Sequence, residues 1–429
     1  MKLDRKIFFR IHSWIGIKLS ILFFIVCFSG TMATLSHELD WLFIPETRAS
    51  YQETTAEKNT IVDNIRRKFP TGKIIYWAAT AESYLCDIVY VNIDEQLFYV
   101  FANPYTGEIQ GKSTLTFQRF FRDLHYYLFI PFQVGHFTVL IFGFMLFVST
   151  VTALFFYKKW YRKLFELSIG KGRIVFFRSL HRLVGVWSIP FTILFSITGI
   201  WYFIERTNIG NVSRIANTRT PKIEELTMDS VSFARLSYTI DYNKAVRAAK
   251  NEIQGLVVKD ILPPSNTTSP IYLTGISDVP LVRNRANRVF VHPVTYDVVM
   301  TQRAEDINTV TWLNDIADPL HFGYWGGLIT KIIWFLGGLG ISALVLTGIW
   351  ISLERKVKNK KKAKAQKMGI WRYVNWLFAA LMLGFMYYIL FTRYNASMTA
   401  MATITLGWIM LSALSWYLFV YKIHRQSSK

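Results

Sequence analysis

Uncharged apolar runs alternate with polar segments along the whole chain. Six runs lack Asp, Glu, Lys and Arg altogether: 19–37, 124–157, 183–204, 332–353, 373–392 and 394–421. About 20 such residues are enough to cross the hydrocarbon core of a bilayer as a helix. Because the second and sixth runs exceed one crossing, we expect an extra segment ending near Pro131 and a short turn around 395–399. The pattern predicts an α-helical integral membrane protein with six transmembrane helices.

Two of the polar segments between these runs are long enough to fold as small domains. The first is predicted to contain an amphipathic helix at 56–69 and strands at 73–76, 85–92 and 97–101. The second is predicted to contain a helix at 242–254 and strands around 256–261, 271–273 and 289–294. A helix followed by strands predicts an α+β domain in each segment.

The positive charge is concentrated beside the apolar runs. The formal net charge is +21, and nearly all of it lies in 1–10, 158–178, 354–372 and 422–429. Because Lys and Arg are retained on the cytoplasmic side of a membrane, these four segments predict cytoplasmic termini and external domains. The charge is then a signal of topology and a contact with anionic lipid, and no nucleic-acid partner is expected.

These patterns divide the chain into consecutive parts. The predicted parts are transmembrane helix 1 (1–40), external domain 1 (41–118), transmembrane helix 2 (119–160), a cytoplasmic loop (161–178), transmembrane helix 3 (179–206), external domain 2 (207–311), transmembrane helix 4 (312–356), a basic cytoplasmic loop (357–370), transmembrane helices 5 and 6 (371–421) and a cytoplasmic tail (422–429).

The chain also contains an internal repeat. The sequence FRIHSWIG at 9–16 resembles RSLHRLVG at 178–185, and each histidine is followed 18 residues later by a glycine, Gly30 or Gly199. A second matched pair, Leu-His at 124–125 and 320–321, precedes the second and fourth helices. These matches predict two pseudo-symmetric parallel halves, with helices 5 and 6 outside the repeat.

The two external domains end in similar segments, FYVFANPYTGEI at 98–109 and RVFVHPVTYDVV at 288–299. Here the chain resembles the PepSY-associated transmembrane-helix family over roughly residues 5 to 356, which implies that both external domains are PepSY-like. The family includes iron-regulated inner-membrane proteins, and some members are haem-containing siderophore reductases. Asn103 and His292 depart from the family pattern, which usually has Asp at this position of the turn.

Six of the eight histidines lie near predicted membrane boundaries. A b-type haem needs apolar walls and one or two imidazole ligands, which helix bundles supply from facing helices. His12 and His181 occupy equivalent inner positions and are candidate axial ligands of one haem. His125 and His321 are candidates for a second haem, with His37 and His136 as competitors, whereas His292 and His424 are expected to be solvated. Contact with lipid phosphate or capping of a helix remains an alternative role for His12 and His181, and anchoring of a helix start remains one for His125 and His321. His37 and His136 have no histidine counterpart in the other half.

Basic side chains suggest two further roles. Near the inner pair, haem propionates could be neutralised by Arg10, Lys18, Arg178 and Arg182. In the external domains, an anionic iron complex could be attracted by Lys73, Arg283, Arg285 and Arg288, although a solvated basic face is the favoured explanation.

Familiar catalytic motifs are missing from the sequence. It has no Gly-x-Gly-x-x-Gly, Walker loop, His-Glu-x-x-His or Gly-x-Ser-x-Gly, and its two cysteines are too few for a metal cage. The family resemblance, together with the paired histidines, implies a ferric-siderophore reductase with one or two haems b. The missing motifs imply a separate electron donor, membrane quinol or reduced flavin. The alternatives are a non-catalytic peptide-binding or protease-regulating protein, and an iron-complex transporter. Transport is disfavoured because the apolar runs contain no charged residue.

Overall fold

The computed structural model describes residues 4–80, 82–358 and 368–421. The chain divides into two compact units, each assembled from separate stretches of sequence. We call them the helical unit (Met1–Leu35, Arg119–Phe203 and Ile332–Lys429) and the sheet unit (Ser36–Gln118 and Ile204–Lys331). Most of the expected loop at 357–370, the tail at 422–429 and His424 lie outside the described residues.

The described residues contain four helical segments long and apolar enough to span a membrane. They are α6 (Phe132–Phe156), Tyr324–Arg355, which includes most of α13 (Gly327–Lys358), α14 (Trp371–Thr392) and Met398–Phe419, which begins with α15 (Met398–Trp416). Two bent helix pairs also pass this test: α1 (Arg5–Lys18) with α2 (Ser20–Thr34), and α7 (Arg173–Trp187) with α8 (Ile189–Thr207). The structure therefore supports four to six spans.

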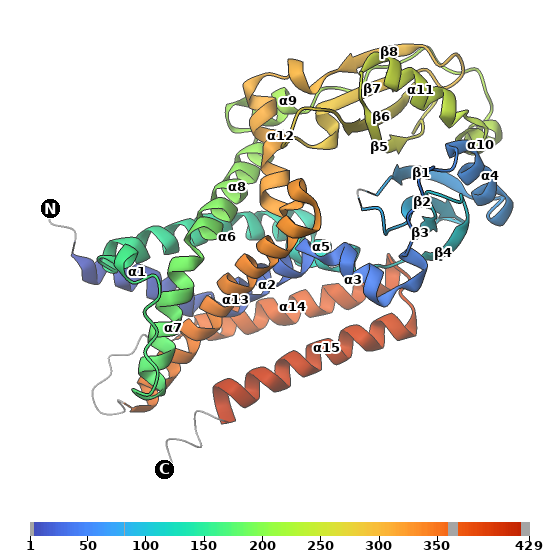
Figure 1. Ribbon diagram of the computed structural model, residues 1–429. Helices are drawn as coiled ribbons and strands as arrows, with labels where there is room; N and C mark the ends of the chain where they lie inside the picture. The colour runs from blue at the N-terminus through green and yellow to red at the C-terminus, as the bar shows by residue number, and fades with distance from the viewer. Residues whose placement is uncertain (1–3, 81, 359–367, 422–429) are drawn as a thin grey trace. The chain divides into compact units, whose positions relative to one another are not determined.

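Expectation and structure differ most at transmembrane helix 1 (1–40), which is predicted as a single helix. In the structure the helix is bent by 76° at Leu19, and the basic segment before the first apolar run forms α1, which lies beside α6 (Figure 1). The second run follows expectation more closely. Before it, α5 (Phe117–Tyr127) ends, Leu128 and Phe129 take positive φ angles, and α6 begins directly after Pro131.

The sheet unit contains one antiparallel sheet with strand order β4-β3-β2-β1-β5-β6-β7-β8 (Figure 1). The two sequence segments expected to form separate domains are joined where β1 pairs with β5, with Trp77 opposite Ile261. Unpaired strand edges invite association with other chains, and this pairing removes two of them. The strands are β1 (Lys73–Ala78), β2 (Asp87–Ile93), β3 (Gln96–Ala102), β4 (Ile109–Ser113), β5 (Val257–Leu262), β6 (Ile271–Ile276), β7 (Asn287–Val291) and β8 (Val298–Gln302).

Three helices cover the sheet and complete its core: α4 (Lys58–Lys68), α10 (Ser230–Thr239) and α11 (Tyr242–Glu252). Ile61 and Ile65 are four residues apart, so they share one face of α4, and both are fully buried. On α11, Ala245 and Ala249 repeat this spacing and are also fully buried. The remaining helices of the sheet unit include α3 (Ser36–Phe43), α9 (Val212–Ala216) and α12 (Thr309–Phe322).

The internal repeat extends to irregular features of the sheet. A break in register lies between Ile74 and Tyr76 of β1, and another between Val258 and Asp260 of β5. A second matched pair lies between residues 101 and 102 of β3 and between 290 and 291 of β7. Because β-bulges are specific local geometries, their recurrence indicates that both halves of the sheet have the same backbone design.

The turns after β3 and β7 are matched as well. In the first, Asn103 Oδ1 accepts hydrogen bonds from the N–H groups of Tyr105 and Thr106 at 2.9 and 3.2 Å. In the second, His292 Nδ1 accepts from the N–H groups of Val294 and Thr295 at 3.3 and 3.2 Å. His292 therefore has the same role as Asn103, as the acceptor that closes the turn.

Candidate functional site

The structure brings His12 and His181 together within the helical unit. His12 lies on α1 and His181 on α7, and their ring centroids are 6.4 Å apart with the ring planes 80° from parallel. Both side chains are partly buried. Residues far apart in sequence thus place two imidazoles at one point of the helical unit, as their equivalent positions in the repeat predict.

Each imidazole is oriented by a hydroxyl-bearing residue from the next long helix of its own half. His12 Nδ1 lies 3.0 Å from the carbonyl oxygen of Ser149 on α6 and 3.1 Å from its hydroxyl. His181 Nδ1 lies 2.8 Å from the hydroxyl of Thr347 on α13. Sequence reasoning missed both partners, although a hydroxyl residue within the apolar run of each half was an available signal.

These contacts determine which nitrogen of each neutral imidazole carries the proton. A carbonyl can only accept, so His12 Nδ1 donates to Ser149. The Thr347 hydroxyl donates to the carbonyl of Ala343 at 2.8 Å, so it accepts from His181 Nδ1. In both rings the lone pair is then on Nε2, which has no hydrogen bond to any residue the structure describes. Metal-binding histidines are commonly oriented through the other nitrogen in this way.

The spacing of the two rings suits one iron between them. A metal–imidazole bond is about 2 Å, so two imidazoles on opposite sides of one metal have centroids about 6 Å apart. The observed separation is 6.4 Å. No group of three or more His, Cys, Asp or Glu side chains that could hold a metal ion occurs among the described residues. Haem iron receives its remaining ligands from the porphyrin, so two imidazoles are the number of side-chain ligands that such an iron would take from the protein.

The four basic residues expected to neutralise haem propionates differ in exposure and in their contacts. Arg10 and Arg178 are exposed near the pair. Lys18 is buried and donates to the carbonyl of Met368 at 3.2 Å. Arg182 lies over the ring of Tyr157 and donates within its own helix to Arg178.

His125 and His136 also belong to the helical unit. His125 Nδ1 lies 2.9 Å from the carbonyl oxygen of Val26, and its ring lies so close to Gly30 that an added Cβ would be 2.7 Å from Cε1. His136 is buried, and its Nδ1 lies 3.1 Å from the carbonyl oxygen of Tyr126. Both imidazoles are therefore oriented through Nδ1 by main-chain carbonyls.

The remaining two candidates, His37 and His321, belong to the sheet unit. His321 lies at the end of α12, next to Phe322. His37 lies on α3 and is partly buried.

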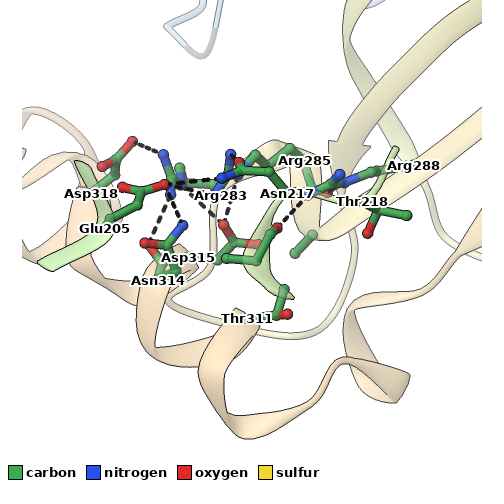
Figure 2. Close-up of polar contacts among 12 residues, drawn as sticks. Glu205, Asn217, Thr218, Arg283, Arg285, Arg288, Thr311, Asn314, Asp315 and Asp318 are labelled. Atoms are coloured by element: carbon green, nitrogen blue, oxygen red, sulfur yellow. Dashed lines mark hydrogen bonds and ion pairs between the residues drawn. The ribbon is translucent and has the colours of Figure 1, made fainter. Parts of the chain in front are cut away.

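The external arginines are engaged within the protein. Arg283 pairs with Asp315 at 3.1 Å and Asp318 at 3.0 Å, and Arg285 pairs with Asp315 at 2.8 Å (Figure 2). Arg288 is buried and donates to main-chain carbonyls. Arg283 and Arg285 are half-buried, and their charges are balanced by acidic side chains of the protein itself. These ion pairs tie the loop before β7 to α12.

A model of the PepSY-associated TM region matches residues 9–355. The chain belongs to this family. The matched residues include His12, His181 and both helix bends. The helices α14 and α15 come after the matched residues in the chain. No curated protein matches the chain. Family membership and the apolar helices together establish a multi-pass membrane protein of the PepSY-associated family.

Proposed function

We propose that this PepSY-associated protein is a haem-containing reductase of the bacterial inner membrane that passes electrons to ferric iron held by a periplasmic siderophore. The observation that carries the proposal is the pair formed by His12 and His181, each oriented through Nδ1. Haem b would supply the one-electron redox chemistry when bound. The chain would supply the axial ligands and the apolar surroundings.

The proposed topology follows from charge. The basic segments 1–10, 158–178, 354–372 and 422–429 share the cytoplasmic side, which gives cytoplasmic termini and leaves the sheet unit in the periplasm. His12 and His181 then lie toward the cytoplasmic side. Electrons would enter there and leave toward the periplasm.

A second haem would complete the path across the membrane. His125 remains a candidate ligand, supported by the Nδ1 contact that orients it, and His136 has the same kind of support. His321 and His37 are the candidates from the sheet unit. Two redox centres would carry electrons over a distance that one centre cannot cover.

The donor would be membrane quinol or reduced flavin, because the sequence contains no dinucleotide-binding motif. Oxidation of one quinol releases two electrons and two protons, so it reduces two ferric ions to ferrous ions. A siderophore with hard oxygen ligands holds Fe²⁺ much less tightly than Fe³⁺. Reduction would therefore release the iron.

An absorption spectrum tests the cofactor. The protein is purified in detergent from cells supplied with haem. Its oxidised and dithionite-reduced absorption spectra are recorded, and its haem-to-protein ratio is measured. We expect a Soret band and a sharp α band in the wild-type protein. Both bands should be weaker in the double variant His12→Ala/His181→Ala. A wild-type protein without a Soret band would overturn the proposal and favour the peptide-binding alternative.

A vesicle assay tests the reaction itself. The haem-loaded protein is reconstituted into liposomes that contain a reductant, and ferric hydroxamate or ferric catecholate is added outside with a ferrous-iron trap. We expect formation of the ferrous complex only with wild-type protein. Equal rates in protein-free liposomes would refute reductase activity, even where haem is bound.

A further inference from the structure

The helices that carry His12 and His181 are bent at equivalent positions. The first bend is 76° at Leu19, and the second is 59° at Ser188. Each bend follows its histidine by seven residues. The direction of α1 or α7, and with it the position of the imidazole, therefore depends on how the bend is maintained.

The second bend can be explained by its own sequence. Pro190 is the second residue of α8. Proline has no N–H group, and its ring clashes with the carbonyl of the residue four positions earlier, which is a common cause of sharp helix bends. Because residue 190 is a proline, it has no N–H group, and the bend at Ser188 leaves no donor unsatisfied at this position.

The first bend has no such residue. The position equivalent to Pro190 is Ile21, the second residue of α2, and residues 17–23 contain neither proline nor glycine. Ile21 has an N–H group, which the bend removes from the regular helical hydrogen bonds. An unsatisfied backbone group is costly inside a membrane, so this bend needs a partner from elsewhere.

Asn375 of α14 supplies that partner. Its Oδ1 accepts from the N–H of Ile21 at 3.3 Å, and its Nδ2 donates to the carbonyl of Lys18 at 2.6 Å. Asn375 is only 1% exposed, and Nδ2 also donates to the carbonyl of Trp371 on its own helix. A carboxamide can accept and donate at once, whereas leucine does neither and aspartate lacks the donor.

We propose that Asn375 is a positioning residue that maintains the first bend, as Pro190 does in the other half, and so places His12 opposite His181. Only the role assigned to His12 rests on the proposed function. Trp14 of α1 contacts Trp371 of α14 with ring centroids 5.3 Å apart, so α14 touches both arms of the bend. The proposal gives α14, which lies outside the matched family region, a specific task.

The bend is tested by a distance measurement that needs no haem. Spin labels are placed at Phe9 on α1 and Val175 on α7, both exposed, in a chain with Cys27→Ser and Cys86→Ser. We expect Asn375→Leu to shift or broaden the distance distribution measured by pulsed electron resonance. Leu377→Ala, an exposed site on the same helix, is the matched control and leaves the distribution unchanged.

Rescue by proline is the decisive test. Ile21→Pro removes the N–H that Asn375 satisfies and introduces the residue found in the other half. The double variant Ile21→Pro/Asn375→Leu should regain the wild-type distance distribution. If Asn375→Leu alone does not fold, the proposal still requires the double variant to fold. An unchanged distribution in Asn375→Leu, or no recovery in the double variant, would overturn it.

The haem spectrum separates this proposal from the proposed function. In Asn375→Leu we expect a large loss, at least several-fold, of the six-coordinate low-spin signal of the His12–His181 site, with recovery in the double variant. If wild-type protein binds no haem, the proposed function fails while the distances still decide the role of Asn375. If the spectrum and the distances are both unchanged in Asn375→Leu, the positioning role is wrong while the reductase proposal stands.

Discussion

The two halves of the sheet unit share a turn of the same backbone geometry, but a different side chain closes it in each half. In the helical unit, by contrast, both halves have a histidine at the equivalent position, but the helix bend beside it involves a different residue in each half. In the sheet, Asn103 and His292 close equivalent turns. In the helical unit, His12 and His181 are identical, but the bends beside them involve Asn375 in one half and Pro190 in the other. A turn needs only a hydrogen-bond acceptor, which several residues provide, while an iron between two imidazoles requires two histidines.

The largest expected effect tests this requirement directly. Because both imidazoles of the proposed site are needed, His12→Ala and His181→Ala should each lower haem occupancy of that site more than tenfold, and to a similar extent. Haem-to-protein ratios and low-spin signals measure the loss. His292→Ala is the control, since it removes a histidine of the sheet unit that closes a turn. Full occupancy in either single variant would show that the halves do not share a ligand site.

A smaller effect is expected from glycines at equivalent positions. In Gly30→Ala the new Cβ would lie 2.7 Å from His125 Cε1, so the ring must move. Such overpacking typically costs about 1–3 kcal/mol. Gly199→Ala should cost less, because its closest described neighbour, the Cα of Gly143, is 3.4 Å away. Thermal unfolding in detergent measures both, and equal melting temperatures would contradict the asymmetry.

The matched turns should respond more weakly. Asn103→Ala removes two hydrogen bonds to main-chain N–H groups, and each is worth about 1 kcal/mol. His292→Ala removes two bonds at 3.3 and 3.2 Å and should cost less. His292→Asn should retain the turn. Denaturant unfolding measures the free energy of unfolding of the three variants. A larger loss of stability in His292→Asn than in His292→Ala would contradict the role of His292 as a turn-closing acceptor.

The smallest effect is chemical, and it concerns Cys86 of the sheet unit. Burial, followed by the nearby negative charges of Asp87 and Glu108, raises the pKa of its thiol to about 12. The thiolate is the reactive form, so almost none is present at pH 8. We expect iodoacetamide to leave Cys86 unmodified at pH 8 until the protein is unfolded, as peptide mass spectrometry would show. Rapid modification of the native protein would mean that the region around Cys86 opens readily.

Much of the architecture follows from sequence patterns because those patterns are local. The apolar runs predict the long helices, and alternation predicts strands close to β1, β2, β3 and β5. Membership of the PepSY-associated family is confirmed by the match over residues 9–355. The repeat placed His12 and His181 at equivalent positions, and the structure shows that their rings are close.

Other features depend on contacts between distant segments, which local patterns do not contain. The bend at Leu19 has no proline or glycine to mark it, and its partner Asn375 lies more than 350 residues later. The pairing of β1 with β5 joins two segments that each look like a complete domain. The arginines at 283 and 285 look like a basic surface in sequence, because their acidic partners on α12 become visible only in the fold.

The pairing of Trp77 with Ile261 sets an order of events during synthesis. At roughly 5–20 residues per second, the ribosome needs about 10–40 s to add the approximately 180 residues between them. Throughout that interval β1 has an open edge, and the chain must insert further helices before β5 arrives. A nascent chain that stalls in between therefore presents a ready template for aggregation, which makes timely translation part of what this protein needs to reach its native state.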